Sequence, residues 1–216
     1  KQTYDARTVV LATGALRRHL GVPGEERLAH RGVSYCAVCD GSFFRGREVA
    51  VVGGGNTALE DALYLAGICP RVWLIHRRAD FRAQAHLVER LHAEPKIEFL
   101  PSSAVTEIRG GDRVESILVG TPHGERELPV SAVFVAVGLV ADNAAFAGLV
   151  ELDESGYIRA GADTRTTCPG VFAAGDTRTA PLRQIVTAAA DGAAAATAAE
   201  QYLRGIAAKN AATAVR

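Results

Sequence analysis

A glycine-rich turn between a short apolar strand and a helix most constrains what this chain can fold into. Residues 48–52 predict the strand, residues 53–58 follow it with the spacing G-x-G-x-x-A, and residues 57–67 carry apolar side chains at helical spacing. Residues 71–75 predict a second strand. Because strand, helix and strand alternate, they predict a right-handed βαβ unit and therefore an α/β fold with a parallel sheet.

The small residues of this turn each have a physical reason to be small. Gly53 allows a tight turn, Gly55 lets a pyrophosphate approach the backbone, and Ala58 permits close packing of helix on strand. The helix begins around Asn56 and Thr57, and its unpaired N–H groups face the phosphates. The motif therefore predicts a site for a dinucleotide. A purely structural glycine turn is the alternative.

The residues after the second strand indicate which dinucleotide is bound. A site for NAD normally carries an acidic residue about 20 positions on, which binds the ribose 2′-hydroxyl. Here that place holds His76, Arg77 and Arg78, with Arg82 one turn later. A guanidinium binds a 2′-phosphate with charge-assisted hydrogen bonds, whereas a carboxylate repels it. The turn predicts NADPH. A solvated basic turn is the alternative, and for Arg82 alone it explains the sequence equally well.

A Cys-x-x-Cys motif is the second feature that points to chemistry. Cys36 and Cys39 are spaced so that their sulfurs can cycle between a thiol pair and a disulfide, and this spacing lowers the pKa of one thiol. The neighbouring Asp40 is a candidate proton shuttle. Half of a zinc site is the alternative, but it needs a second Cys or His pair, and Cys69 and Cys168 are each alone. The motif therefore predicts a redox dithiol and no metal.

Composition excludes several classes of function. The chain has 216 residues, 48% of them hydrophobic, and a formal net charge of +0, so no basic field points to nucleic acid or to an anionic membrane. Its Ala-rich segment, residues 188–199, is shorter than the ~20 apolar residues of a bilayer span. With no pattern of a secretory signal, we expect a cytoplasmic protein in which a structural disulfide is disfavoured. Partners are expected to be small molecules or proteins.

The order of the segments suggests two domains and a longer parent protein. The chain starts at Lys1 on what resembles a mid-domain strand and contains no Met, so we expect a fragment. Residues 17–26 mix Gly and Pro with charged residues, which predicts a linker. Further strands are predicted before Gly138, with hairpin turns at 110–112 and 122–124. A long helix is predicted from about Gln184 to Leu203.

Taken together, these motifs closely resemble the low-molecular-weight thioredoxin reductases. The resemblance rests on residues 36–41, 53–60, 76–83 and 170–176, in the order and spacing of that family, and extends to the helical segment 183–203. It covers nearly all of the chain. The resemblance implies that Cys39 faces a flavin ring, that Cys36 attacks the disulfide of thioredoxin, and that Asp40 is the acid.

The resemblance also implies the cofactors, FAD and NADPH, and the residues that bind them. Asp176 is expected to hold the ribityl–phosphate region of FAD, with three residues bordering its ring. The expected cofactor contacts in the second half of the chain are Gly138, Gly175, Asp176, Arg183, Gln184 and Ile185. Electrons are expected to pass from NADPH to FAD, to the Cys36–Cys39 disulfide and then to thioredoxin.

The domain organisation expected from the resemblance is two Rossmann-like FAD/NAD(P)-binding domains. An NADPH-binding domain, residues 18–141, is inserted into an incomplete FAD domain formed by residues 1–17 and 142–216. The first glycine-rich FAD motif of the family belongs to a segment preceding Lys1, so this chain alone is expected to bind FAD weakly or not at all. The family swivels its nicotinamide domain about a linker, and the full-length protein is expected to be a homodimer.

Other functions remain open at this point. A related flavoprotein would pass electrons from its dithiol to a peroxidase partner. A non-catalytic module would bind NADPH through residues 21–138 alone. Flavin absorbance of the purified protein distinguishes the module from the enzymes.

Overall fold

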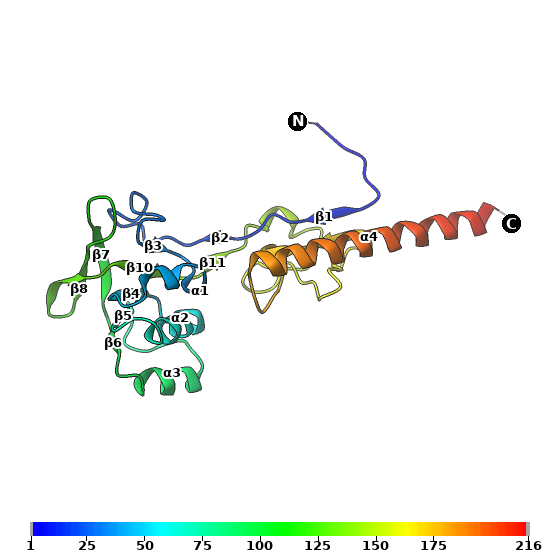
Figure 1. The fold of residues 1–216 in the computed structure, drawn as a ribbon. Helices are drawn as coiled ribbons and strands as arrows, with labels where there is room; N and C mark the ends of the chain where they lie inside the picture. The colour runs from blue at the N-terminus through cyan, green and yellow to red at the C-terminus, as the bar shows by residue number, and fades with distance from the viewer. Residues whose placement is uncertain (1, 215–216) are drawn as a thin grey trace. The chain divides into compact units, whose positions relative to one another are not determined.

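The computed structural model describes residues 2–214, with side chains through residue 208. Within these residues the chain divides into two compact units (Figure 1). One unit, here the central unit, is the continuous stretch Arg18–Gly138. The other, here the flanking unit, is formed by the stretch up to Arg17 together with the stretch from Leu139 onward. The central unit is therefore an insertion in the sequence of the flanking unit.

A parallel sheet forms the middle layer of the central unit. Its strands lie in the order β3, β10, β4, β5 and β6. Their bounds are β3 Val33–Ser34, β4 Val49–Val52, β5 Val72–Ile75, β6 Ile97–Leu100 and β10 Ala132–Val135. The strands β4, β5 and β10 are buried along their whole length, because both faces of the sheet are covered. The prediction of an α/β fold with a parallel sheet is confirmed.

Helices cover one face of this sheet. The helix α2 (Asn56–Ala66) connects β4 to β5, and α3 (Ala85–His92) connects β5 to β6. Leu59 and Leu65 of α2 pack with Val51, Leu74 and Phe134 of the sheet. Ala58 is fully buried there, as close packing of helix on strand requires. The predicted βαβ unit is thus present.

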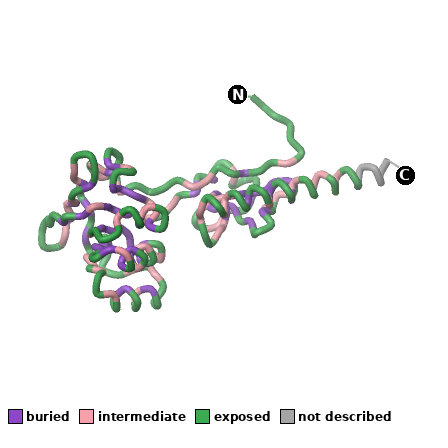
Figure 2. The backbone as a smooth tube through the Cα atoms, in the orientation of Figure 1, coloured by how far each residue is buried: buried purple, intermediate pink, exposed green. Residues whose placement is uncertain are grey.

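An antiparallel layer covers the other face. The strands β7 (Ala104–Arg109), β8 (Ser116–Thr121) and β9 (Gly124–Pro129) pair in that order through the two predicted hairpins. Their side chains Ile108 and Ile117 pack with Trp73 and Val135 of the parallel sheet. Figure 2 colours the buried residues of the central unit purple.

The topology of the parallel sheet marks one place where a ligand can bind. The chain leaves β4 toward β5 on one side, while the neighbour of β4 on its other side is β10. In open parallel sheets, ligands bind outside the carboxyl ends of the strands where the connections diverge in this way. Residues 53–55, the predicted glycine turn, follow β4 at that point.

The flanking unit has smaller sheets and one long helix. The strands β1 (Val9–Leu11) and β12 (Val171–Ala173) pair in parallel, and β2 (Leu16–Arg17) pairs antiparallel with β11 (Leu139–Val140). The short helices η2 (Ala144–Phe146) and η3 (Gly175–Thr177) lie in its loops.

The long helix α4 (Ile185–Ala214) packs through small side chains. Ala195 and Ala198 lie against Phe172 and Ala174, which allows the helix to approach β12 closely. The predicted end at Leu203 was wrong. The helix continues because residues 204–214 include five alanines, alanine being the best helix former, and contain no proline. None of the helices described in residues 2–214 is both long enough and apolar enough to cross a membrane.

Candidate functional site

The two predicted redox cysteines form a disulfide. Cys36 is bonded to Cys39 with their Cα atoms 5.3 Å apart. Cys36 precedes the short helix α1 (Ala37–Asp40), which continues into η1 (Gly41–Phe44). The N–H of Cys39 donates to Cys36 Sγ at 3.2 Å. Cys36 is half-buried, whereas Cys39 and Val38 are exposed, so the sulfur pair is at the surface of the central unit.

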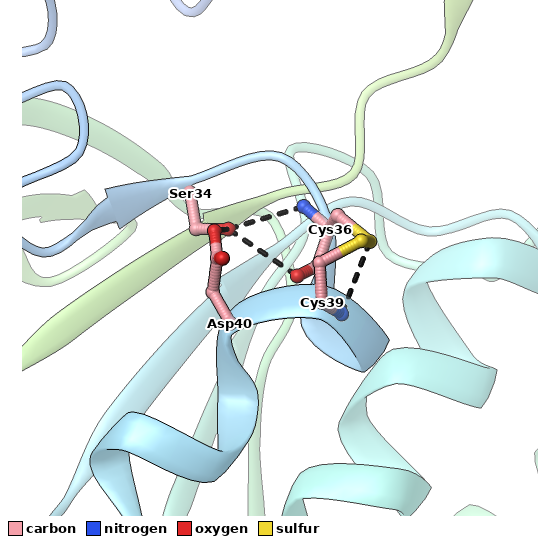
Figure 3. The surroundings of a disulfide bond; sticks show 4 residues. All are labelled: Ser34, Cys36, Cys39 and Asp40. Atoms are coloured by element: carbon pink, nitrogen blue, oxygen red, sulfur yellow. Dashed lines mark hydrogen bonds between the residues drawn. A yellow bond between two sulfur atoms is a disulfide. The ribbon is translucent and has the colours of Figure 1, made fainter. Parts of the chain in front are cut away.

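Asp40 is held next to this disulfide by Ser34 (Figure 3). The hydroxyl of Ser34 donates to Asp40 Oδ2 at 2.6 Å and accepts from the N–H of Cys36 at 3.1 Å. Ser34 lies in β3 and is 5% exposed. A buried serine therefore joins the predicted acid to the first cysteine. Sequence reasoning missed Ser34, because a serine two residues before a cysteine carries no signal of its own.

The glycine turn has the geometry that its motif predicts. Gly53 has φ +156°, and a Cβ on it would lie 2.4 Å from the carbonyl oxygen of Ala136 and 2.7 Å from Ala58 Cβ. Gly55, by contrast, faces open space and precedes the first residue of α2. A phosphate can reach the N–H groups at the start of α2 only if this approach is open. The turn is thus packed closely against the protein at Gly53 and open to solvent at Gly55.

The basic turn after β5 is tied to the glycine turn. The N–H of Arg82 donates to the carbonyl of Gly54 at 2.8 Å, and the N–H of Gln84 donates to Asn56 Oδ1 at 2.8 Å. The side chains of Arg77, Arg78 and Arg82 are exposed, as is that of Thr57. The fold therefore brings the predicted pyrophosphate turn and the predicted 2′-phosphate arginines together. The side chain of Asn56 accepts one of the two hydrogen bonds that connect these turns.

His76 lies under this pair of turns. It is 6% exposed, and a Cβ on Gly54 would lie 2.3 Å from its ring. Burial, helped by the charges of Arg78, Arg82 and Arg77, holds the pKa of His76 below its usual value although a backbone hydrogen bond with Asp80 opposes this. Its Nε2 is buried and has no hydrogen-bond partner among the described residues. A buried polar atom of this kind is normally satisfied, which indicates a ligand or solvent partner.

The dithiol helix and the glycine turn share one packing contact. Gly41 packs so closely on α2 that a Cβ there would lie 2.9 Å from Leu65 Cδ2 and 3.0 Å from Tyr64 Cε1. The helix that begins at the glycine turn therefore also supports the chain just after Cys39.

Gly138, another predicted cofactor contact, follows β10 with φ +105°, and its carbonyl accepts from the N–H of Arg18. It is exposed.

Another cluster of predicted residues lies in the flanking unit. Gly175 and Asp176 form most of η3, and the N–H of Gly175 donates to Asp191 Oδ2 at 3.0 Å. Asp191 also accepts two hydrogen bonds from the guanidinium of Arg178, at 2.7 and 2.6 Å. These bonds, chiefly those from Arg178, hold the pKa of Asp191 below its usual value. This buried pair, which sequence reasoning also missed, fixes η3 on α4.

The remaining predicted flavin-side residues lie at the start of α4. The guanidinium carbon of Arg183 lies 4.1 Å from the ring centre of Tyr157. Arg183 Nε is buried and has no hydrogen-bond partner among the described residues. Gln184 precedes the helix, and its carbonyl accepts from Thr187 Oγ1 at 2.8 Å. Ile185 is 91% exposed. The start of α4 and the loop before it thus offer one unsatisfied donor, Arg183 Nε, and one exposed apolar side chain, Ile185.

The other cysteines are separate from this chemistry. Cys69 is buried and donates to the carbonyl of Phe44 at 3.4 Å, and Cys168 is half-buried. In the described part of the chain, no three His, Cys, Asp or Glu side chains come close enough to hold a metal ion.

Asp61, in α2, is a further titratable group that sequence reasoning missed. Burial, with repulsion from Glu60, raises its pKa to about 7. A carboxyl with a raised folded pKa contributes stability below its unfolded pKa, and this contribution is lost as the pH rises through the folded value. We expect Asp61→Asn to stabilise the protein by about 2 kcal/mol at about pH 8, roughly half of what the shift implies because the group is partly solvated.

Denaturant unfolding at two pH values measures this effect. The gain should vanish below about pH 3, where Asp61 is protonated in both the folded and the unfolded state. Asp112→Asn, in an exposed hairpin turn, is the matched control and should change the free energy of unfolding by less than about 0.5 kcal/mol. A gain for Asp61→Asn that does not depend on pH would contradict the raised pKa.

Comparison with known proteins identifies the family. The family model described as pyridine nucleotide-disulphide oxidoreductase matches residues 1–192. The chain is 49% identical to a thioredoxin reductase of Listeria innocua over 205 residues, covering 94% of this chain and 64% of that protein. It is 45% identical to a thioredoxin reductase of Peptoclostridium acidaminophilum, covering 94% of this chain and 67% of that protein.

A solved structure agrees with these matches. The crystal structure of thioredoxin reductase from Streptococcus pyogenes superposes with a TM-score of 0.85 at 44% identity, covering 92% of this chain and 66% of that one. The chain thus spans about two thirds of the length of the proteins that it matches. On the evidence of its sequence, its redox disulfide and its fold, the chain belongs to the pyridine nucleotide-disulphide oxidoreductases, and within them to the low-molecular-weight thioredoxin reductases.

Proposed function

We propose that the full-length protein to which this chain belongs is a thioredoxin-disulfide reductase that uses NADPH and FAD. The observation that carries the proposal is the surface disulfide Cys36–Cys39 with Asp40 held beside it. Relatives that are 49% and 45% identical carry the name thioredoxin reductase, which supports the choice of thioredoxin as the electron acceptor.

The central unit fits the role of the NADPH-binding domain. The open approach at Gly55 suits the pyrophosphate, and the exposed Arg77 and Arg78 suit the 2′-phosphate. The unpartnered Nε2 of His76 offers a buried polar atom beneath the glycine turn. The backbone N–H of Arg82 donates to the carbonyl of Gly54, so the side chain of Arg82 begins next to the glycine turn.

The flanking unit fits part of an FAD domain into which the NADPH domain is inserted. Asp176 would hold the ribityl–phosphate region, and its loop is fixed by Asp191 and Arg178. The buried, unpartnered Nε of Arg183 and the exposed Ile185 would border the ring. When bound, NADPH supplies a hydride and FAD passes its electron pair to the disulfide.

The residues of the central unit carry out the dithiol step. After the disulfide has received two electrons, the thiolate of Cys36 attacks the disulfide of thioredoxin, so that a mixed disulfide forms and one thioredoxin thiolate leaves. Asp40 gives its proton to that thiolate and takes another from the thiol of Cys39. The Cys39 thiolate then attacks Cys36 Sγ, which re-forms the Cys36–Cys39 disulfide and releases the second thioredoxin thiolate, protonated by water.

A turnover assay of the purified full-length protein tests this function. We expect NADPH oxidation that depends on oxidised thioredoxin, with two thiols formed per NADPH consumed. NADPH oxidation that requires a peroxidase partner and does not occur with thioredoxin would favour the related flavoprotein. A preparation without flavin and without turnover would favour the NADPH-binding module.

A further inference from the structure

The serine that joins Asp40 to the dithiol occupies a fixed position. Ser34 lies in β3, which pairs in parallel with β10 so that Ser34 is opposite Phe134. β10 is itself buried and paired on its other side with β4. The side chain of Ser34 therefore projects from the sheet rather than from a loop, so the position of its Oγ is fixed while its hydroxyl hydrogen remains free to turn.

The hydroxyl of Ser34 has three polar neighbours. Asp40 Oδ2 lies at 2.6 Å, the N–H of Cys36 at 3.1 Å and the carbonyl oxygen of Cys36 at 3.3 Å (Figure 3). A serine hydroxyl has one hydrogen to donate and two lone pairs with which to accept. The N–H of Cys36 always uses one lone pair, which leaves the hydrogen and the second lone pair to serve the other two neighbours.

These neighbours satisfy the hydroxyl in both protonation states of Asp40. When Asp40 is ionised, the hydroxyl donates to Oδ2. When Asp40 carries a proton, Asp40 donates to the hydroxyl, and the hydroxyl hydrogen turns toward the carbonyl of Cys36. Neither state leaves a donor without an acceptor, and the change from one to the other needs only rotation of the hydroxyl.

We propose that Ser34 is a positioning residue for the dithiol step, which holds Asp40 against the Cys36 turn both before and after Asp40 transfers its proton. This inference rests on the proposed function and adds to it a residue that acts through Asp40. Without the hydroxyl, the carboxyl of Asp40 would be free to rotate toward solvent, and the N–H of Cys36 would lose its acceptor.

The variant Ser34→Ala in the full-length protein tests the proposal. We expect kcat for thioredoxin reduction to fall about tenfold or more, as expected when a hydrogen bond to a charged group is lost. The rate at which NADPH bleaches the flavin should remain that of the wild type in rapid-mixing experiments, because the hydride step precedes the dithiol step. A variant slowed equally in both steps would show a general structural role and overturn the proposal.

A double-mutant cycle with Asp40→Asn shows whether Ser34 acts through Asp40. If it does, adding Ser34→Ala to Asp40→Asn lowers kcat by no more than about twofold further. Losses that simply multiply would overturn the proposal. The conservative variant Ser34→Thr keeps the hydroxyl and should keep kcat within about threefold of the wild type. If flavin bleaching by NADPH is normal in Ser34→Thr but this variant reduces thioredoxin as slowly as Asp40→Asn, the proposal is also overturned. This test remains available even if Ser34→Ala does not fold.

The chain offers a matched control for the lost hydrogen bond. Ser116 donates to Glu127 Oε1, also at 2.6 Å, in the antiparallel layer between β8 and β9. Ser116→Ala removes the same kind of bond and should leave both steps unchanged. If the wild-type protein does not reduce thioredoxin at all, the proposed function fails. If the wild-type protein reduces thioredoxin and Ser34→Ala reduces it at the same rate, the proposed function stands and only the proposed role of Ser34 fails.

Discussion

Cys36→Ser and Cys39→Ser are each expected to lower thioredoxin reduction by the full-length protein by about 10³-fold or more. Each variant removes one sulfur of the disulfide that links the two cysteines. Without Cys36 no mixed disulfide with thioredoxin forms, and without Cys39 the mixed disulfide is not resolved. NADPH should still bleach the flavin in both variants, because the hydride step needs neither sulfur. Stopped-flow absorbance and a thioredoxin-coupled assay measure the two steps separately.

The remaining cysteines provide the controls for this prediction. Cys168→Ser changes a half-buried thiol outside the motif, and Cys69→Ser changes a buried one. Both should keep thioredoxin turnover within about threefold of the wild type. Substantial turnover by Cys36→Ser or Cys39→Ser would remove the motif from the mechanism, while equal loss in all four variants would point to misfolding.

Replacing Arg77 and Arg78 together by alanine is expected to raise the dissociation constant of NADPH by about tenfold to a hundredfold. The 2′-phosphate is the only difference between NADPH and NADH, and charge-assisted hydrogen bonds are worth roughly 1.5–3 kcal/mol each. The expected total is less than the sum of two such bonds, because both side chains are exposed and screened by solvent. NADH should bind as it does to the wild type, and fluorescence titration measures both constants.

A second pair of exposed arginines is the control for charge alone. Arg45 and Arg47 precede β4 and therefore lie at the amino end of that strand, opposite the glycine turn. Arg45→Ala with Arg47→Ala removes the same net charge and should change the affinity for NADPH by less than about twofold. Equal weakening of NADPH and NADH in the Arg77 and Arg78 variant would contradict the assignment of a 2′-phosphate site.

Much of the fold and the shape of the glycine turn could be predicted from the sequence because most of their signals are local. The apolar runs 48–52 and 71–75 on either side of a helical pattern predicted the parallel βαβ unit that is present. Gly53 has no room for a side chain, and Ala58 is fully buried, as the spacing required. The approach of Gly53 to Ala58 joins residues close in sequence, so their spacing carries it, whereas the approach of Gly53 to Ala136 exists only in the folded sheet.

The details that depend on how the chain folds in space could not be predicted in this way. Ser34 reaches Asp40 only because both residues flank the disulfide turn beside the sheet, and Arg178 reaches Asp191 only because η3 packs on α4. The helix α1 is four residues long, too short for a periodic pattern.

The sequence by itself therefore determined the groups available for chemistry in this protein: a cysteine pair, a glycine-rich turn and a basic turn. Only the tertiary structure decided which residue holds Asp40 in place and that the basic turn is bonded to Gly54. The physical reason is that hydrogen bonds and packing depend on distances in space. Those distances are set by the pairing of strands and the docking of helices, which bring together residues that the sequence separates.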